Sequence, residues 1–425
     1  MSTERERKLD ELARRYRERL AQEWPEGETD VTGIEEIVRR VERDVLRELT
    51  EEMLREQTGK RPGNHVACPE CGGSARYRKQ TVQKLVTLFG RVKIERAYFH
   101  CAACRQGVCP QDQAWGIGPG NTTPGVQDLA AALGAGDAYT HLPSVLRRTR
   151  PQVVLDVKTL EQVAQRLGNH LAATPPVGLG RAERAVAVAM DGVMVPQRGG
   201  CKEARCGVVY EPDWTAGRSA TACAGLRKEY LGTLASRDTL ARAVCARVAA
   251  RRPTAKTVVA ALGDGADWIW EGYARYLPHR VEILDFFHVS ERLGQIAAAM
   301  HPEDEKAARA WQETQEKDLQ VLGPGRLLER LAAWSPDRAP AREVRRINLG
   351  YFQNQRERMD YPRYLREGWP IGSGAVEGAC KHLVSDRFRG TGMRWKSPTA
   401  EPLLQLRAVL LTHPDLDLRP YAHAT

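Results

Sequence analysis

The sequence lacks the features that place a chain in a membrane or outside the cell. Its 425 residues contain no apolar run of about 18 residues or more, so no membrane span is expected. The first twenty residues, MSTERERKLDELARRYRERL, are too charged for a secretory signal. We therefore expect a cytoplasmic protein with no membrane partner.

Several other patterns are missing. The P-loop pattern GxxxxGK[ST] does not occur, which disfavours an ATP-dependent mechanism. We find no internal repeat and no low-complexity tract. The 10 cysteines do not form the framework of a small secreted disulfide protein, because four of them stand in two close pairs and the rest are scattered. This distribution favours a reduced chain with one metal site.

Positive charge is in excess. The formal net charge is +10, and the first sixty residues are on balance acidic, so the rest of the chain carries the excess. Nucleic acid is the commonest polyanionic partner of such a chain. A basic surface without such a partner is the alternative. The length allows two to four domains.

The N-terminal region, 1–60, is predicted to be helical. Residues 3–24 and 31–57 carry apolar side chains at three- and four-residue spacing among mixed charges. A solvated helical hairpin is the simpler interpretation, and self-association through the apolar stripe is the alternative.

The next region, 61–115, has the spacing of a zinc ribbon. The motifs CPEC and CAAC form the pattern C-x2-C-x29-C-x2-C, and the segment between them predicts a β-hairpin that turns near Gly90. Two such turns close a tetrahedron of thiolates, which leaves no open position and is typical of structural zinc. A redox dithiol is disfavoured because there are two pairs. The expected ligands are Cys68, Cys71, Cys101 and Cys104, with His65, His100 and Cys109 outside the set.

Residues 116–180 begin with a linker and continue as short helices over 125–173. A DNA-binding helix-turn-helix is one interpretation of this region. It fits the lengths of the helices, the segment TLEQVAQRL and the pair Arg147 and Arg148. Small helical bundles share this pattern.

After residue 180 the pattern changes to strands and helices. We expect strands over 185–195, 206–211 and 221–226. Strand–turn–helix units are then expected over 257–270 and 280–293. This order predicts a mixed α/β sheet. Residues 300–366 are charged and predicted to be helical.

Three acids are candidates for catalysis. We expect Asp191 to end the first strand of the α/β region and Asp264 to end a later one, each beside a glycine. Glu377 stands at a helix start that Ser373 can cap. Carboxylates from separate elements suit Mg²⁺, and two such ions can hold the attacking and leaving oxygens of a phosphodiester. Alternatively, Glu377 is only a favourable helix-start charge. Asp267 and Asp285 compete with Asp264.

From the cysteine pairs onward the chain resembles the ISKra family of bacterial insertion-sequence transposases, relatives of the mutator-like group. The matching segments, in order, are CPECGG, ERAYFHCAAC, AMDG, GDGADWIW, LDFFHVSERL, YFQNQRERM, PIGSGAVEGACK and TGMRW. The ordered set spans residues 68–395.

The resemblance implies a multidomain protein with an α/β ribonuclease-H-like catalytic core, 181–299 and 367–413, interrupted by a helical insertion, 300–366, and followed by a tail, 414–425. It implies a DDE triad of Asp191, Asp264 and Glu377 that binds two Mg²⁺ or Mn²⁺ ions. Asp285 and His288 stand where relatives place an acid and a histidine, and we interpret them as supporting residues.

The resemblance also implies a DNA transposase that cuts at the element ends and joins them to target DNA as a homo-oligomer. The zinc ribbon and the helices over 125–173 are expected to bind the terminal repeats. A basic strip follows the helix of Glu377 and consists of Arg387, Arg389, Arg394, Trp395 and Lys396. We expect this strip to contact the DNA backbone. The alternative is a solvated basic tail. The alternatives are a domesticated DNA-binding regulator without catalysis and a ribonuclease-H-like nuclease that does not transpose.

Overall fold

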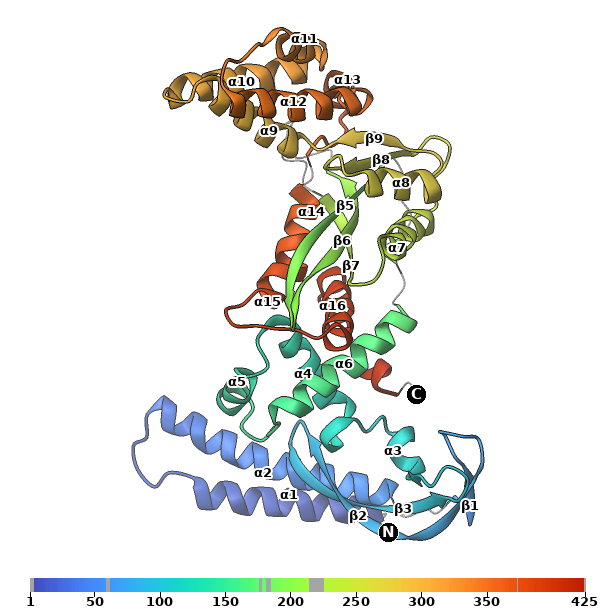
Figure 1. The fold of residues 1–425 in the computed structure, drawn as a ribbon. Helices are drawn as coiled ribbons and strands as arrows, with labels where there is room; N and C mark the ends of the chain where they lie inside the picture. The colour runs from blue at the N-terminus through green and yellow to red at the C-terminus, as the bar shows by residue number, and fades with distance from the viewer. Residues whose placement is uncertain are drawn as a thin grey trace. The chain divides into compact units, whose positions relative to one another are not determined.

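The chain folds into two units (Figure 1). The computed structural model describes residues 4–58, 62–175, 178–180, 185–213, 225–372 and 374–423. The first unit comprises Met1–His170 with Leu416–Thr425, and the second comprises Leu171–Asp415. In the described part of the chain no helix is long and apolar enough to cross a membrane.

The first unit begins with the predicted helical hairpin, α1 (Glu4–Glu23) and α2 (Val31–Gln57). Asp30 caps α2 by accepting a hydrogen bond from the backbone N–H of Gly33 at 2.8 Å. Ion pairs join the helices in antiparallel order, as between Lys8 and Glu56 at 2.9 Å and between Arg40 and Glu23 at 3.2 Å. Such exposed pairs contribute about 0–1 kcal/mol each. The hairpin is therefore largely solvated.

A four-stranded antiparallel sheet follows, with the order β1-β2-β3-β4. Its strands are β1 (His65–Ala67), β2 (Ser74–Thr87), β3 (Gly90–Cys101) and β4 (Gly107–Val108). The predicted hairpin is confirmed, and Gly90 has the positive φ of +116° that its turn requires. Val92 and Ile94 are buried while Arg91 and Lys93 are exposed, so one face of β3 is wet and basic, as expected.

Short helices complete the first unit and confirm the helical prediction for 125–173. They are α3 (Pro110–Ala114), η1 (Pro119–Asn121), α4 (Pro124–Gly136), α5 (Leu142–Thr149), α6 (Val157–Ala173) and the C-terminal η4 (Arg419–His423). The amide of Gln127 in α4 is buried and donates to the carbonyls of Gly116 and Thr122, which fixes the linker against this helix.

The second unit contains a mixed five-stranded sheet with the order β7-β6-β5-β8-β9. Its strands are β5 (Ala185–Gln197), β6 (Gly200–Pro212), β7 (Gly225–Thr233), β8 (Val258–Gly263) and β9 (Val281–Leu284). Strands β5, β6 and β7 are antiparallel neighbours, whereas β8 runs parallel to β5 and to β9. The mixed α/β prediction is confirmed.

Helices cover both faces of this sheet, which explains why β5 is almost continuously apolar. On one face lie α7 (Arg237–Ala250) and α8 (Asp267–Tyr276). On the other lie α14 (Gly374–Ala379), the π-helical turn η3 (Cys380–Ser385), α15 (Asp386–Phe388) and α16 (Ser397–Thr412). A Cβ added to Gly207 would lie 2.4 Å from Val244 of α7, and one added to Gly232 would lie 2.8 Å from Leu383 of η3. Both faces are therefore closely packed.

Between β9 and α14 the chain forms the expected set of helices. These are α9 (Phe286–Met300), α10 (Glu305–Leu322), α11 (Gly325–Ala333), α12 (Ala339–Asn354), the short η2 (Arg356–Arg358) and α13 (Tyr361–Glu367). Leu319, Leu327 and Leu331 are buried among them, in agreement with their prediction as apolar anchors.

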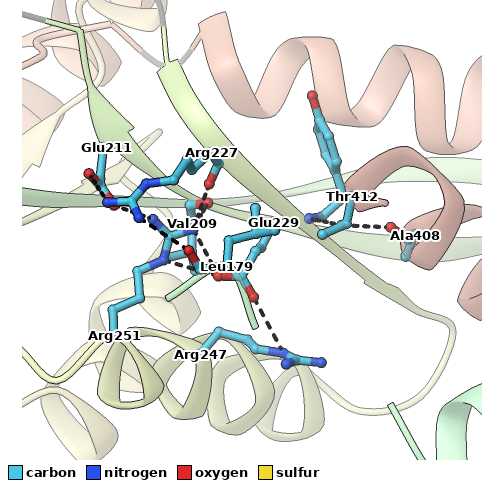
Figure 2. A network of polar contacts seen from close by, with 10 residues as sticks. Leu179, Val209, Glu211, Arg227, Glu229, Arg247, Arg251, Ala408 and Thr412 are labelled. Carbon is cyan, nitrogen blue, oxygen red and sulfur yellow. Dashed lines mark hydrogen bonds and ion pairs between the residues drawn. The ribbon is translucent and has the colours of Figure 1, made fainter. Parts of the chain in front are cut away.

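Figure 2 shows a buried polar network that the sequence pattern did not indicate. Arg251, at the C-terminal end of α7, is 1% exposed and donates to Glu229 of β7 at 2.8 Å and to Glu211 of β6 at 3.1 Å. It also donates to the backbone carbonyls of Val209 and Arg227. The guanidinium therefore fastens α7 to two strands.

Two local predictions fall outside the described residues. Ser373 as a helix cap is one, and most of the strand expected over 221–226, with Cys223, is the other. The described part of β7 begins at Gly225.

Candidate functional site

The four predicted cysteines lie together in the first unit. Strand pairing brings the turn after β1 beside the turn after β3, and all four Sγ atoms lie within 4.8 Å of one another. The Sγ atoms of Cys68 and Cys104 are 3.5 Å apart, and those of Cys71 and Cys101 are 3.6 Å apart. Thiolates bound to one tetrahedral zinc at about 2.3 Å lie about 3.8 Å from each other. The cluster therefore fits a metal ion such as zinc.

The thiols of this cluster differ in acidity. The backbone N–H groups of Gly73 and Gln106 favour the thiolates of Cys71 and Cys104, but burial and hydrogen bonds with neighbouring cysteines raise the pKa of both, to about 12 for Cys104. The backbone N–H of Cys104 points at the sulfur of Cys101 and is the largest cause that lowers the pKa of that thiol to about 7. His65, His100 and Cys109 are not members of the group of four, as expected.

In the second unit, strand register aligns three aspartates across neighbouring parallel strands. Ala189 of β5 pairs with Leu262 of β8, so Asp191, two residues on, stands level with Asp264. Gly263 pairs with Leu284 of β9, which places Asp285 directly beyond the end of that strand. The carboxyl ends of β8 and β9 thus present one aspartate each beside Asp191. The expectation that Asp191 ends its strand is wrong, because β5 continues to Gln197 through its pairing with β6.

Asp191 is partly buried, and its surroundings oppose its negative charge. Burial raises the pKa of this carboxyl, and the charge of Asp264 adds to the effect. The backbone N–H of Gly192, at 2.6 Å, and the thiol of Cys380, at 3.6 Å, act in the opposite direction. A bound cation would favour the charged carboxylate here.

The turn that carries Asp264 is held by the helical segment. Tyr351 of α12 donates its hydroxyl to the Asp264 carbonyl at 2.7 Å, and the Gln355 amide donates to the Gly265 carbonyl at 3.2 Å. The guanidinium of Arg292, in α9, lies over the Tyr351 ring at 3.7 Å. Gly265 has a φ of +98°, and an added Cβ would lie 2.7 Å from that ring. The contact therefore excludes a larger residue at this turn.

Asp285 and His288 form a hydrogen-bonded pair beside the other two aspartates. Asp285 is fully buried and caps α9 by accepting from the backbone N–H groups of Phe287 and His288. Its carboxylate binds the His288 ring, and this hydrogen bond is the largest cause that raises the pKa of His288 to about 9. Asp264 and Asp191 contribute to the same shift. These carboxylates therefore favour the protonated, cationic form of His288.

Asp267, the competitor of Asp264, is the first residue of α8 and is exposed. Asp264 lies in the turn itself, where its carboxylate accepts from the backbone N–H of Ala266 at 2.8 Å. Asp267 therefore lies outside the turn, because the chain has already entered α8 at this residue.

Glu377 lies on α14, one turn before the Cys380 that contacts Asp191. Its side chain is exposed. In the described part of the chain, the four cysteines are the one group in which three or more metal-binding side chains meet within 4.8 Å. The structure thus brings Asp191, Asp264, Asp285 and His288 into one neighbourhood. Glu377 lies on the adjacent helix, and it does not meet two of these side chains within that distance.

The expected basic strip is divided between the surface and the interior. Arg389, Arg394 and Lys396 are exposed. Arg387, in contrast, is only 2% exposed, and its guanidinium lies 5.1 Å from the centre of the Trp395 ring. Trp395 is 9% exposed and donates its indole N–H to the Phe388 carbonyl. Neither of these two side chains faces solvent, because both pack the loop against the unit.

Arg147 and Arg148 are exposed in the last turn of α5. Sequence reasoning missed Cys380, Tyr351, Gln355 and Arg292. Two of these residues, Tyr351 and Gln355, belong to the segment YFQNQRERM. That segment indicated a helix but did not indicate a contact with the turn of Asp264.

The fold and these clusters define a mixed α/β protein with a four-cysteine site that can hold a metal ion such as zinc. The chain belongs to the family described as "Uncharacterised protein family (UPF0236)", whose pattern matches residues 20–415. A comparison with curated proteins finds no match.

Proposed function

We propose that this protein is a DNA transposase, a metal-dependent polynucleotidyl transferase with Asp191, Asp264 and Glu377 as its catalytic acids. The observation that carries the proposal is the alignment of Asp191 and Asp264 on adjacent parallel strands. Asp264 directly follows the end of β8, and Asp191 lies on β5 where the pairing with β8 has stopped. The carboxyl ends of parallel strands are where α/β folds commonly bind ligands.

The strand order supports a ribonuclease-H-like core. Such a core has a sheet in which three antiparallel strands are followed by two parallel ones, and the order β7-β6-β5-β8-β9 with its directions has this form. The helices from α10 to α13 then correspond to the insertion before the helix of the third acid.

The donor set fits Mg²⁺ or Mn²⁺. Both cations prefer oxygen ligands, and the raised pKa of Asp191 marks a place where a positive ion stabilises the charged carboxylate. Asp191, Asp264 and Glu377 would hold the two ions, and such ions would supply charge stabilisation for the attacking and leaving oxygens of a phosphodiester. His288 balances the charge of the aspartates, and Tyr351 holds the turn of Asp264 in place.

The other parts of the chain serve DNA recognition in this proposal. The four cysteines hold a structural zinc, because four thiolates leave no coordination position for substrate. Arg147, Arg148, Arg389, Arg394 and Lys396 are exposed and contact DNA phosphates. Pairing of two DNA ends then calls for a homo-oligomer.

The test uses Asp191→Asn, Asp264→Asn and Glu377→Gln in the full chain, with DNA that carries the repeats flanking the gene's own locus. Each variant keeps the side-chain volume but removes a charge, so each should bind this DNA and lose cleavage. A double variant should be hardly worse than a single one, because residues that act as a unit are not additive.

Asp267→Asn is the matched control and should keep substantial cleavage. If Asp267→Asn is inactive while Asp264→Asn cleaves, the second acid is misassigned. Normal cleavage by Glu377→Gln would mean that this residue is only a helix-start charge, and the proposed triad would then be wrong.

A further inference from the structure

A two-stranded ribbon projects beyond the parallel strands of the second unit. Pairing of β5 with β8 ends at Ala189, and pairing of β6 with β7 ends at Arg205. The pairing of β5 with β6 continues to Gln197 and Gly200. Residues 193–204 are therefore a hairpin with no third strand beside it in the described part of the chain.

The tip of this ribbon is fastened to the loop that follows α15, and Figure 1 shows the two side by side. The backbone N–H of Arg198 donates to the Trp395 carbonyl at 2.9 Å, and the N–H of Trp395 donates to the Pro196 carbonyl at 3.1 Å. The Ser397 hydroxyl donates to the Gln197 side chain at 3.0 Å. Because Trp395 is itself buried, the tip is anchored to the body of the unit.

This junction carries a set of basic side chains that we call the basic cradle: Arg198, Lys202, Arg389, Arg394 and Lys396. All five are exposed, and none forms an ion pair within the described ranges of the chain. Many other basic residues of the protein are neutralised by a nearby carboxylate, as Arg205 is by Glu203 at 2.8 Å. Exposed positive charge gathered from two distant segments attracts anionic partners.

The tip is also open. A hollow there is lined by residues 196–201 and by Arg394, and no acidic side chain belongs to this lining as far as the structure is described. Gly199 and Gly200, at φ of +96° and +146°, have no atom within 4 Å of an added Cβ. The amide nitrogen of Gln197 is buried without a hydrogen-bond partner among the described residues. The backbone at Gly199 and Gly200 can thus approach a bound oxygen closely.

Helix α16 adds to the positive potential at this point. Lys396 occupies its N-cap, and its first turn contains no acidic residue. The N-terminus of a helix carries about half a positive charge, so cations there are unfavourable unless an anion compensates them. A phosphate between Lys396 and the ribbon tip would provide that compensation.

We propose that the basic cradle binds the phosphodiester backbone of duplex DNA. Asp191 and Gln197 are six residues apart on β5 and on the same face, which is about 20 Å along the strand. For a duplex that lies along β5, that distance corresponds to about six base pairs at 3.4 Å per step. Resting on the proposed function, the cradle holds the duplex about six base pairs from the phosphate that is cut.

The test compares Arg198→Ala/Lys202→Ala with a control that loses the same charge, Lys306→Ala/Arg326→Ala. The control residues are exposed in α10 and α11 of the same unit. The probe is a fluorescein-labelled 30-base-pair duplex of arbitrary sequence, titrated by anisotropy without divalent cations between 50 and 200 mM KCl. The full-length protein is used throughout.

At 100 mM salt the cradle variant should bind on the order of tenfold more weakly or worse, and its slope of log affinity against log salt should fall by about 1–2. The control should match the wild type in affinity at 100 mM salt and in the salt slope. Equal behaviour of the two variants would overturn the cradle. A loss confined to single-stranded RNA of the same length would also overturn it, since RNA would then be the partner.

The outcome is separable from that of the proposed function. If the cradle variant binds DNA normally while Asp191→Asn cannot cleave, the cradle is wrong and the transposase proposal stands. If the cradle variant loses DNA binding while Asp191→Asn cleaves normally, the cradle stands and the catalytic assignment fails.

Discussion

Removal of the buried guanidinium of Arg251 should destabilise the second unit strongly. Its Nε and Nη2 atoms donate to the same oxygen of Glu229 at 3.0 and 2.8 Å, and Nη1 donates to Glu211 (Figure 2). Arg251→Met keeps an unbranched apolar side chain but leaves Glu229, whose side chain is 5% exposed, without its main partner. Loss of one member of a buried ion pair costs about 3–5 kcal/mol, because the remaining charge stays desolvated.

The control lies on the same helix. Arg242 pairs with Asp238 at 2.8 Å, but its side chain is 70% exposed, so Arg242→Ala should cost at most about 1 kcal/mol. A second variant, Arg251→Met/Glu229→Leu, removes both charges of the main pair. It should recover at least half of the loss, because replacement of a buried pair by apolar residues is often neutral.

Hydrogen exchange of the backbone amides in β6 and α7 is the appropriate measurement, since a chain of two units need not unfold in one step. In Arg251→Met these amides should exchange on the order of 100-fold faster or more, given about 1.4 kcal/mol per tenfold. The reasoning is refuted if Arg251→Met exchanges no faster than Arg242→Ala, because the network would then be solvated in solution.

Three further predictions concern the metal cluster and the aspartate row. Metal analysis should find about one zinc per chain in the wild type and none in Cys68→Ser. Cys109→Ser is the control and should keep the zinc content of the wild type. A metal-free wild type with a stable sheet would contradict the zinc assignment. Tyr351→Phe should slow DNA cleavage about five- to tenfold without weakening DNA binding, because one hydrogen bond worth about 1 kcal/mol no longer holds the Asp264 turn. Tyr276→Phe is the control. It loses a hydroxyl that is bonded to Asp238, and it should cleave normally. The folded-state pKa of His288 is raised above that of the unfolded chain, so the stabilisation by His288 is complete below about pH 6.5 and is lost as the pH rises through about 9. The difference in melting temperature between metal-free wild type and His288→Gln should therefore close over that range, and a constant difference would exclude a titrating His288.

Much of the fold follows from local patterns in the sequence. The spacing of apolar residues predicted α2 at the bounds that the structure has, 31–57. The alternation of Val92 and Ile94 with Arg91 and Lys93 predicted a hairpin with one wet face. The long apolar stretch at 185–195 predicted a strand covered on both sides. These features are readable because periodicity, turns and C-x2-C spacing depend on residues close together in the chain.

The candidate site was readable only in part. Glycine-flanked aspartates after apolar strands pointed to Asp191 and Asp264. Their alignment depends on the pairing of Ala189 with Leu262, which is a long-range register and cannot be read from either segment alone. The exposed position of Asp267 was also undecided until α8 was seen to begin at that residue.

Burial was the property that the sequence described least well. Arg387 and Arg389 are indistinguishable in a basic segment, yet Trp395 covers the first and leaves the second in solvent. Tyr351 reaches the Asp264 carbonyl across 87 positions, and Cys380 reaches Asp191 across 189.

By itself, the sequence determined the elements of this protein, the spacing of its four paired cysteines and the chemical types of its acids. Tertiary structure alone decided which charges are buried, which acids stand side by side and which arginines remain exposed to solvent. The physical reason is that an element depends on neighbours along the chain, whereas burial and charge pairing depend on side chains brought together from distant segments by packing.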